Sequence, residues 1–225
     1  MIRGAVFDID GTLLDSLGIW EEADERYLME QGIRPEKDLG RILYPMTMQE
    51  ACAYIRKHYP VKDTESGIAA SILKIVENFY QKEAPLKEGA AGFLRSLSQE
   101  GLPIIAATTG EKELADAAFQ RLGIRQLFRE ILTCTQIGAG KDRPKIYEEA
   151  ARLMGSRPEE TLVFEDALYA VKTAAAAGFV TVGVRDPYND EDKEKIIETA
   201  DYYLEDLTDF PGFREALRAS GKLSG

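Results

Sequence analysis

Two aspartates, Asp8 and Asp10, stand at the end of an apolar segment, residues 5–9, that is predicted to be a buried strand. In an extended chain, residues two apart point to the same side, and Gly11 then allows the backbone to turn sharply. Two carboxylates about 4 Å apart would repel each other by roughly 4 kcal/mol at an effective dielectric of 20. We therefore expect a positive group to lie between them.

Other polar residues also stand where predicted strands end. Thr108 and Thr109 follow one such strand, Glu165 and Asp166 follow another, and Lys141 lies in a loop that contains glycine. In a parallel α/β sheet, ligands gather at the carboxyl ends of the strands. These side chains are therefore candidates for a single site.

The acidic members of this set are Asp8, Asp10, Glu165 and Asp166, and the set contains no His or Cys. Ligands that are all oxygen suit a hard cation. Mg²⁺ is the natural candidate, because it keeps several waters and binds through few carboxylates together with a substrate phosphate. For an isolated Asp-x-Asp-Gly, a turn or a helix cap would be the simpler interpretation.

The rest of the sequence supplies the elements that would position these residues. From residue 86 onward, short apolar runs alternate with amphipathic segments, as in strand-helix-strand units. Strands are expected over residues 5–9, 103–107, 130–133, 161–164, 180–184 and 202–204. Helices are expected over residues 90–99, 112–122, 144–154, 167–177 and 191–198. This pattern predicts an α/β fold with a doubly wound parallel sheet.

Residues 15–85 break the alternation, because they show helical periodicity throughout and offer no convincing strand. Pro35, Pro45 and Pro60 separate the expected helices. We predict an all-helical cap domain at residues 15–85, inserted into a catalytic core made of residues 1–14 and 86–225.

Composition excludes several classes of protein. The formal charge of −11 argues against nucleic acid as a partner, because binding to a phosphate backbone depends on clustered Lys and Arg. Two cysteines are too few for a disulfide framework or a zinc site. The N-terminus does not resemble a signal peptide, and no segment approaches the roughly 20 apolar residues of a membrane span. We expect a cytoplasmic protein that needs no protein partner.

Residues 8–16 (DIDGTLLDS) resemble the first motif of the haloacid dehalogenase superfamily. Residues 104–108 (IIAAT) resemble its second motif, which ends in a phosphate-binding Thr or Ser. Lys141, within residues 140–147, resembles the third motif, and residues 163–166 (VFED) resemble the acidic fourth. The helical insert resembles the cap of the subgroup that includes β-phosphoglucomutase and phosphoglycolate phosphatase.

This resemblance implies a Mg²⁺-dependent phosphatase that acts on a small phosphorylated metabolite. It implies that Asp8 is the nucleophile and forms an aspartyl-phosphate. Asp10 would protonate the leaving oxygen and then deprotonate the attacking water. The metal would be held by Asp8, by the backbone carbonyl of Asp10 and by Asp166. Glu165 would be either a second ligand or a support for the ligands.

The resemblance also assigns the phosphate donors. Thr108 and Lys141 would donate hydrogen bonds to the phosphoryl oxygens, where charge is concentrated during transfer. Thr109 is equally well placed, either for the phosphate or as the N-cap of the following helix.

Two other functions stay open. A sugar-phosphate mutase is the main alternative, but Ile19 and Trp20 stand where the mutase carries a His, and residues 43–48 contain no Arg to hold a second phosphate. A regulatory protein that binds phosphate without turnover is a further alternative, although the intact acidic set argues against it.

Trp20 and residues 44–48, which include Tyr44, Met46 and Met48, could form a specificity surface or the core of the cap. The acidic stretch at residues 186–194 is interpreted as a solvated helix start.

Overall fold

The computed structural model describes residues 1–43 and 46–223. These residues form two compact units, of which one is Met1–Asp15 with Pro85–Gly225 and the other is Ser16–Ala84. The chain therefore leaves the first unit after Asp15 and returns at Pro85. The catalytic and cap roles that the sequence suggests for the two units stay predictions.

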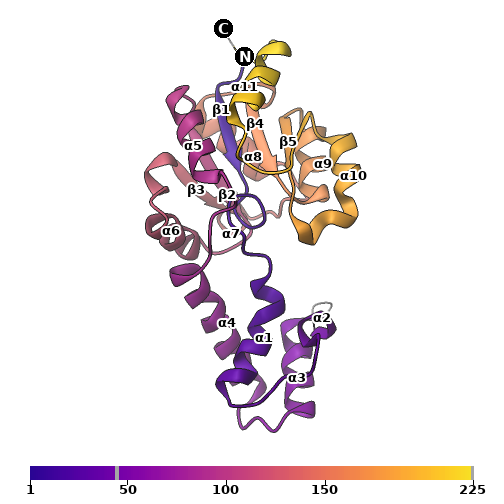
Figure 1. Cartoon of the computed structure of the whole chain (residues 1–225). Helices are drawn as coiled ribbons and strands as arrows, with labels where there is room; N and C mark the ends of the chain where they lie inside the picture. Colours follow the sequence, from indigo (N-terminus) through magenta and orange to yellow (C-terminus); the bar gives the residue numbers. More distant parts are fainter. Residues whose placement is uncertain (44–45, 224–225) are drawn as a thin grey trace. The chain divides into compact units, whose positions relative to one another are not determined.

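The first unit is built on one six-stranded sheet (Figure 1). Its strands are β1 (Gly4–Phe7), β2 (Ile104–Thr108), β3 (Glu130–Thr133), β4 (Thr161–Glu165), β5 (Val180–Val184) and β6 (Tyr202–Leu204). The spatial order is β3-β2-β1-β4-β5-β6, and each neighbouring pair is parallel. The predicted α/β fold with a parallel sheet is confirmed. The two central strands are β1 and β4, which precede the predicted acidic residues.

Helices connect the strands of this unit (Figure 1). They are α5 (Ala90–Gln99), α6 (Lys112–Arg121), α7 (Cys134–Ile137), α8 (Lys145–Met154), α9 (Leu168–Ala176), α10 (Lys193–Thr199) and α11 (Phe210–Ala219), with 3-10 turns at Arg125–Leu127, Pro158–Glu160 and Pro187–Asp192. The sequence pattern does not predict α7 or α11. In α11, Pro211 and Gly212 obscured the helical pattern, although Asp209 caps the helix through the Gly212 N–H at 2.9 Å.

Alternate residues of the strands pack on opposite faces of the sheet. On one face the rings of Phe7 and Phe164 stack with centroids 3.9 Å apart, and Phe93 of α5 and Phe213 of α11 pack against them. On the other face, Val6 and Val163 belong to a buried cluster with residues of α8 and α9. Burial on both faces explains why the strands read as continuous apolar runs rather than as alternating ones.

The segment after β1 leaves the sheet earlier than predicted, at Phe7 instead of Ile9. The N–H of Asp8 still donates to the carbonyl of Phe164 at 3.0 Å. The carbonyl of Ile9 then accepts from Leu13 and Leu14, so the chain folds into a compact turn. Gly11 has φ of 87°, a left-handed conformation that glycine adopts without strain. The turn holds both aspartates at the carboxyl end of the central strand.

The second unit is helical, as predicted for this segment. Its helices are α1 (Ile19–Glu30), α2 (Leu39–Leu43), α3 (Met48–His58) and α4 (Glu65–Lys82). Thr47 and Glu50 form a reciprocal capping box at the start of α3, and Thr64 caps α4. Tyr44 and Pro45, part of the predicted specificity segment, lie outside the described residues.

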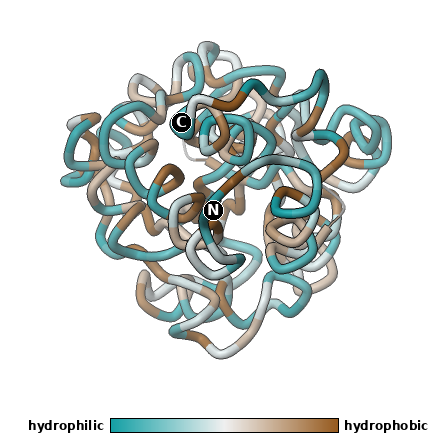
Figure 2. Tube along the Cα trace, turned by 90° about the horizontal axis from the view of Figure 1, so that it is seen from below, coloured by the Kyte–Doolittle hydropathy of each residue, from teal (hydrophilic) through white to brown (hydrophobic). Residues whose placement is uncertain are grey.

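Hydrophobic and hydrophilic residues alternate at short intervals along the trace (Figure 2). In keeping with that pattern, no helix within the described part of the chain has the length and apolar character needed to cross a membrane.

Candidate active site

Asp8 lies in the turn after β1, with 6% of its surface exposed. One carboxylate oxygen, Oδ1, accepts a hydrogen bond from the ammonium of Lys141. The other oxygen, Oδ2, is buried and has no hydrogen-bond partner among the described residues. A buried carboxylate oxygen without a partner is costly, so it indicates a place for a ligand.

Lys141 brings a positive group to Asp8 and Glu165, whereas the sequence predicts one between Asp8 and Asp10. Its side chain is 2% exposed, and its ammonium contacts Asp8 and lies 2.7 Å from Oε1 of Glu165. Burial alone would lower the pKa of Lys141, but the two carboxylates outweigh burial and raise that pKa above its ordinary value. The side chain therefore remains a cation at neutral pH.

Three carboxylates converge beside this lysine. One oxygen from each of Asp8, Glu165 and Asp166 can be chosen so that all lie within 4.8 Å of one another, and all three residues are buried. Burial raises the pKa of Glu165 to about 7. The charge of Lys141 opposes this rise, and the carboxylate of Asp8 adds to it. Burial and the neighbouring carboxylates raise the pKa of Asp166 well above its ordinary value. One ammonium does not neutralise three carboxylates, so the cluster has the charge and the donor atoms to hold a divalent cation.

Asp10 and Thr108 meet at a neighbouring point of the same edge. A Cβ added to Gly110 would lie 3.3 Å from Oγ1 of Thr108 and 3.7 Å from Oδ2 of Asp10. The N–H of Gly110 donates to that Thr108 hydroxyl at 2.8 Å. The loop after β2 thus approaches the Asp10 carboxylate closely, and the missing side chain of Gly110 leaves space between them.

The structure brings most of the predicted residues together, but not equally. Asp8, Lys141, Glu165 and Asp166 form the direct cluster, whereas the carboxylate of Asp10 is outside the group of three. Thr108 is buried at the end of β2. Thr109 is exposed in the following loop, and it does not cap α6, whose N-cap position is Glu111.

Three further residues hold the acidic cluster in place. Asp166 accepts from Thr12 at 3.2 Å on Oδ1 and from Asn189 at 2.6 Å on Oδ2, while Tyr147 donates to Oε1 of Glu165 at 2.8 Å. Such contacts fix the orientation of metal-ligating side chains.

Asn189 was missed because it lies in the acidic stretch interpreted as a solvated helix start. That interpretation is wrong for the beginning of the stretch. Asp186 is only 2% exposed, and the chain forms a 3-10 turn at Pro187–Asp192 before α10 begins. The Asp186 carboxylate accepts from the Tyr188 N–H at 2.9 Å. This local turn directs Asn189 toward Asp166, and a charge pattern alone does not reveal it.

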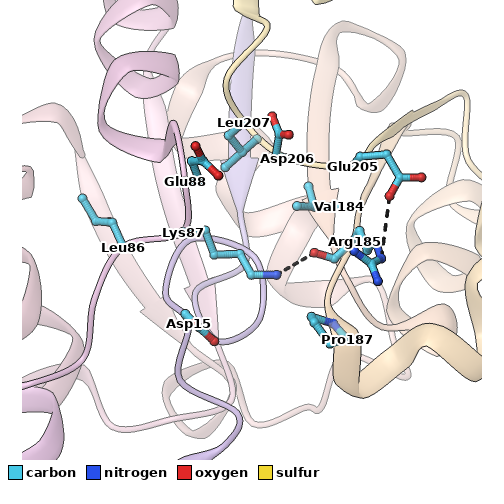
Figure 3. Close-up of a pocket in the computed structure, with 10 residues that line it drawn as sticks. All are labelled: Asp15, Leu86, Lys87, Glu88, Val184, Arg185, Pro187, Glu205, Asp206 and Leu207. Carbon is cyan, nitrogen blue, oxygen red and sulfur yellow. Dashed lines mark hydrogen bonds and ion pairs between the residues drawn. The ribbon is translucent and has the colours of Figure 1, made fainter.

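A separate pocket of about 240 Å³ lies in the same unit (Figure 3). It is lined by Asp15, Leu86, Lys87, Glu88, Val184, Arg185, Pro187, Glu205, Asp206 and Leu207. Lys87 donates to the carbonyl of Arg185 at 2.6 Å and pairs with Asp186 at 2.7 Å. None of the seven predicted site residues lines this pocket, so it is distinct from the predicted site of the chemistry.

The protein is an α/β protein with a parallel sheet, and it carries a buried acidic cluster, a candidate metal site, at the carboxyl edge of that sheet. The family model of haloacid dehalogenase-like hydrolases matches residues 2–178. The chain belongs to that family, and the predicted resemblance is confirmed.

Curated relatives of the chain have been named as phosphatases. Hexitol phosphatase A of Escherichia coli K12 is 30% identical over 82% of this chain and 84% of its own length. Glyceraldehyde 3-phosphate phosphatase of Methanopyrus kandleri is 30% identical over 85% of this chain and 91% of its own. A Thermotoga maritima structure assigned as a β-phosphoglucomutase superposes with a TM-score of 0.80 at 20% identity, covering 99% of this chain and all of that one. The last likeness shows the fold alone.

Proposed function

We propose that this chain hydrolyses the phosphoric monoester of a small metabolite, with Asp8 as the nucleophile. The observation that carries the proposal is the buried Oδ2 of Asp8, which has no partner among the described residues and lies in a cluster with Lys141 and two more carboxylates. The curated phosphatases that are 30% identical to this chain over the aligned residues support the same reaction class.

The reaction would proceed in two displacements at phosphorus. In the first, a carboxylate oxygen of Asp8 bonds to phosphorus while the bond to the leaving oxygen breaks, and Asp10 gives that oxygen a proton. In the second, Asp10 takes a proton from water, the water oxygen bonds to phosphorus, and the bond to Asp8 breaks. Inorganic phosphate and the alcohol are the products, and both aspartates return to their starting states.

Lys141 and Thr108 would hold the phosphoryl oxygens through these steps. The ammonium of Lys141 is fixed between Asp8 and Glu165, so it needs little rearrangement to stabilise the growing charge. Thr108 is held at the end of β2 by the Gly110 N–H, which leaves its hydroxyl proton free to donate. Thr109 stays a weaker candidate for the same role.

We further propose that the acidic cluster binds Mg²⁺. The all-oxygen donors and the partnerless Oδ2 of Asp8 fit a hard divalent cation. Asp8, the carbonyl of Asp10 and Asp166 would hold the ion, with Glu165 as a further ligand or a support. When bound, Mg²⁺ would stabilise the negative charge on the phosphoryl group.

Two finer points belong to the same proposal. The helical unit, Ser16–Ala84, would act as a cap that excludes bulk water during the reaction. The cytoplasm would be its location, which two free thiols suit. The mutase alternative rests on structural likeness at 20% identity, and no other observation favours it.

Release of phosphate from p-nitrophenyl phosphate with added Mg²⁺ tests the proposal. Asp8→Asn should lower kcat by at least about 1,000-fold, because it removes the nucleophile. Asp192→Asn removes one surface aspartate that pairs with Lys195 and should keep wild-type activity. A wild-type rate in Asp8→Asn, or no hydrolysis by folded wild type of any ester in a metabolite screen, contradicts the proposal.

A further inference from the structure

The helical unit contains a pocket of its own, with a volume of about 280 Å³. Every helix of the unit contributes to it or adjoins it, so the pocket is a feature of the unit's packing. It is lined by Trp20, Asp24, Leu43, Met46, Met48, Ala51 and Ile72. Six of these seven side chains are apolar, and Asp24 is the single acidic one.

Asp24 is the unusual member of this lining. It is 8% exposed, and it forms no hydrogen bond or ion pair with any residue in the ranges 1–43 and 46–223. Glu25 and Cys52 interact with it electrostatically, and neither supplies a positive charge. A buried carboxylate is expected to have a counter-ion or donors, and the described protein gives Asp24 neither.

The pocket's composition narrows the kind of ligand that could complete it. A polyol would bury several hydroxyl groups against apolar walls, and one carboxylate could satisfy few of them. A neutral hydrocarbon would leave Asp24 unpaired. A cation that carries alkyl groups satisfies both features, because its charge pairs with Asp24 and its carbon atoms contact the walls.

Trp20 strengthens this choice. It lies one helical turn before Asp24 on α1, so both side chains lie on the same face of the helix and line the same pocket. The face of an indole ring attracts cations, and tryptophan does so more strongly than the other aromatic residues. Thioethers of Met46 and Met48 add polarizable apolar surface.

We propose that this pocket binds an alkylammonium group, with the carboxylate of Asp24 as its counter-ion and the indole of Trp20 as its aromatic wall. The cation could come from two sources. It could be the ammonium end of a phosphorylated amino alcohol, a case that rests on the proposed phosphatase function. It could also be a separate free amine.

Binding can be measured without any catalysis, because Trp20 is the single tryptophan of the chain. Choline is titrated while tryptophan fluorescence is recorded, and 3,3-dimethyl-1-butanol serves as the uncharged analogue of the same shape. Choline should bind at least about tenfold more tightly than the alcohol, as expected for a buried charge-assisted contact. Equal affinities, or no saturable signal with choline, overturn the proposal.

Two variants test the role of Asp24. Asp24→Asn should weaken choline binding about tenfold and change the alcohol's affinity by less than about twofold. Glu30→Gln removes one exposed negative charge from the same helix and should leave both affinities unchanged. Thermal unfolding of each variant establishes that it is folded. A folded Asp24→Asn that binds choline as wild type does contradicts the proposal.

A second pair of variants covers the case in which Asp24→Asn does not fold. Met48→Lys places an ammonium at the pocket wall, where it can pair with Asp24 and exclude choline. Leu73→Lys puts the same charge at a residue that is 52% exposed on α4, and it should bind choline normally. Equal choline binding by the two variants would contradict the proposal.

A kinetic comparison separates the two sources of the cation. If the ligand is part of the substrate, phosphocholine should be hydrolysed with a kcat/KM about tenfold above that of 3,3-dimethylbutyl phosphate, and Asp24→Asn should remove this preference. Choline binding without such a preference assigns the pocket to a separate amine. Failure to hydrolyse p-nitrophenyl phosphate would refute the phosphatase function and leave the fluorescence result intact.

Discussion

The ammonium of Lys141 and Oε1 of Glu165 form an ion pair 2.7 Å apart, in which both side chains are 2% exposed. The same ammonium contacts Asp8, so one cation lies against two buried carboxylates. Removing one partner of a buried pair leaves a charge without compensation, which destabilises proteins more than removing the whole pair. Lys141 therefore has a structural role in addition to its proposed contact with phosphate.

Lys141→Met should test both roles of this lysine. We expect the free energy of unfolding to fall by about 3 kcal/mol, as for other broken buried pairs. We expect kcat/KM to fall at least about 100-fold, because a charge-stabilising donor is lost. Urea unfolding and phosphate release measure the two effects. Lys145→Met, at an exposed position near the start of α8, should change stability by less than about 0.5 kcal/mol. Similar results for both variants would contradict the assigned roles.

Binding of Mg²⁺ to the acidic cluster should stabilise the folded protein. At a concentration 100 times the dissociation constant, we expect a gain of about 2.7 kcal/mol, seen as a rise in Tm. Asp166→Asn should abolish this rise, whereas Asp192→Asn should preserve it. Treatment with a chelator should stop hydrolysis, and fresh Mg²⁺ should restore it. An equal rise in Tm for Asp166→Asn would exclude this carboxylate as a ligand.

Asn189 should act on the metal site through Asp166, to which it donates at 2.6 Å. Asn189→Ala should weaken Mg²⁺ binding by about 10- to 100-fold, as loss of such supporting contacts does elsewhere. At saturating Mg²⁺, kcat should stay within about threefold of wild type, because Asn189 does not touch the reacting atoms in this scheme. Asn78→Ala, in α4 of the other unit, is the matched control. An unchanged Mg²⁺ titration would contradict the positioning role.

The sequence predicted the sheet well because its signals are local. Burial on both faces makes each strand a short apolar run. Gly101, Gly123, Gly155 and Gly178 mark where four of the helices end, namely α5, α6, α8 and α9. The cluster of Asp8, Lys141, Glu165 and Asp166 was also predictable, since the carboxyl ends of parallel strands meet at one edge. The helix α11 was missed because Pro211 and Gly212 suggest a loop.

What the sequence could not reveal depends on tertiary contacts. Asn189 and Asp166 are 23 residues apart in the sequence. The buried turn at Asp186 brings their side chains together. Tyr147 reaches Glu165 because α8 packs against β1 and β2. Asp24 carries no sequence signal of burial either, since a helical aspartate is ordinarily exposed.

The burial of Asp24 should make the stability of the helical unit depend on pH. Burial raises the pKa of Asp24 to about 6 from its ordinary 3.8, with a smaller contribution from Glu25. Burial, with a smaller contribution from Asp24, raises the pKa of the Cys52 thiol of α3, so that thiol is neutral in this range. In the folded state the carboxyl group of Asp24 therefore keeps its proton to a higher pH than it does in the unfolded chain. Stability should fall as pH rises from about 4 to about 6 and stay lowered above that, by at most about 3 kcal/mol.

Asp24→Asn is neutral at every pH, so it should escape this penalty. Relative to wild type, its free energy of unfolding should rise by about 2 kcal/mol between pH 4.5 and pH 7.5, because part of the wild-type penalty has already developed at pH 4.5. Urea unfolding followed by Trp20 fluorescence reports on the unit that contains Asp24. Glu30→Gln should show no such pH-dependent difference. Saturating choline should remove most of the wild-type penalty near pH 7, because its positive charge stabilises the ionised carboxylate. If the free energies of unfolding of Asp24→Asn and wild type differ by the same amount at every pH in this range, then folding does not raise the pKa of Asp24.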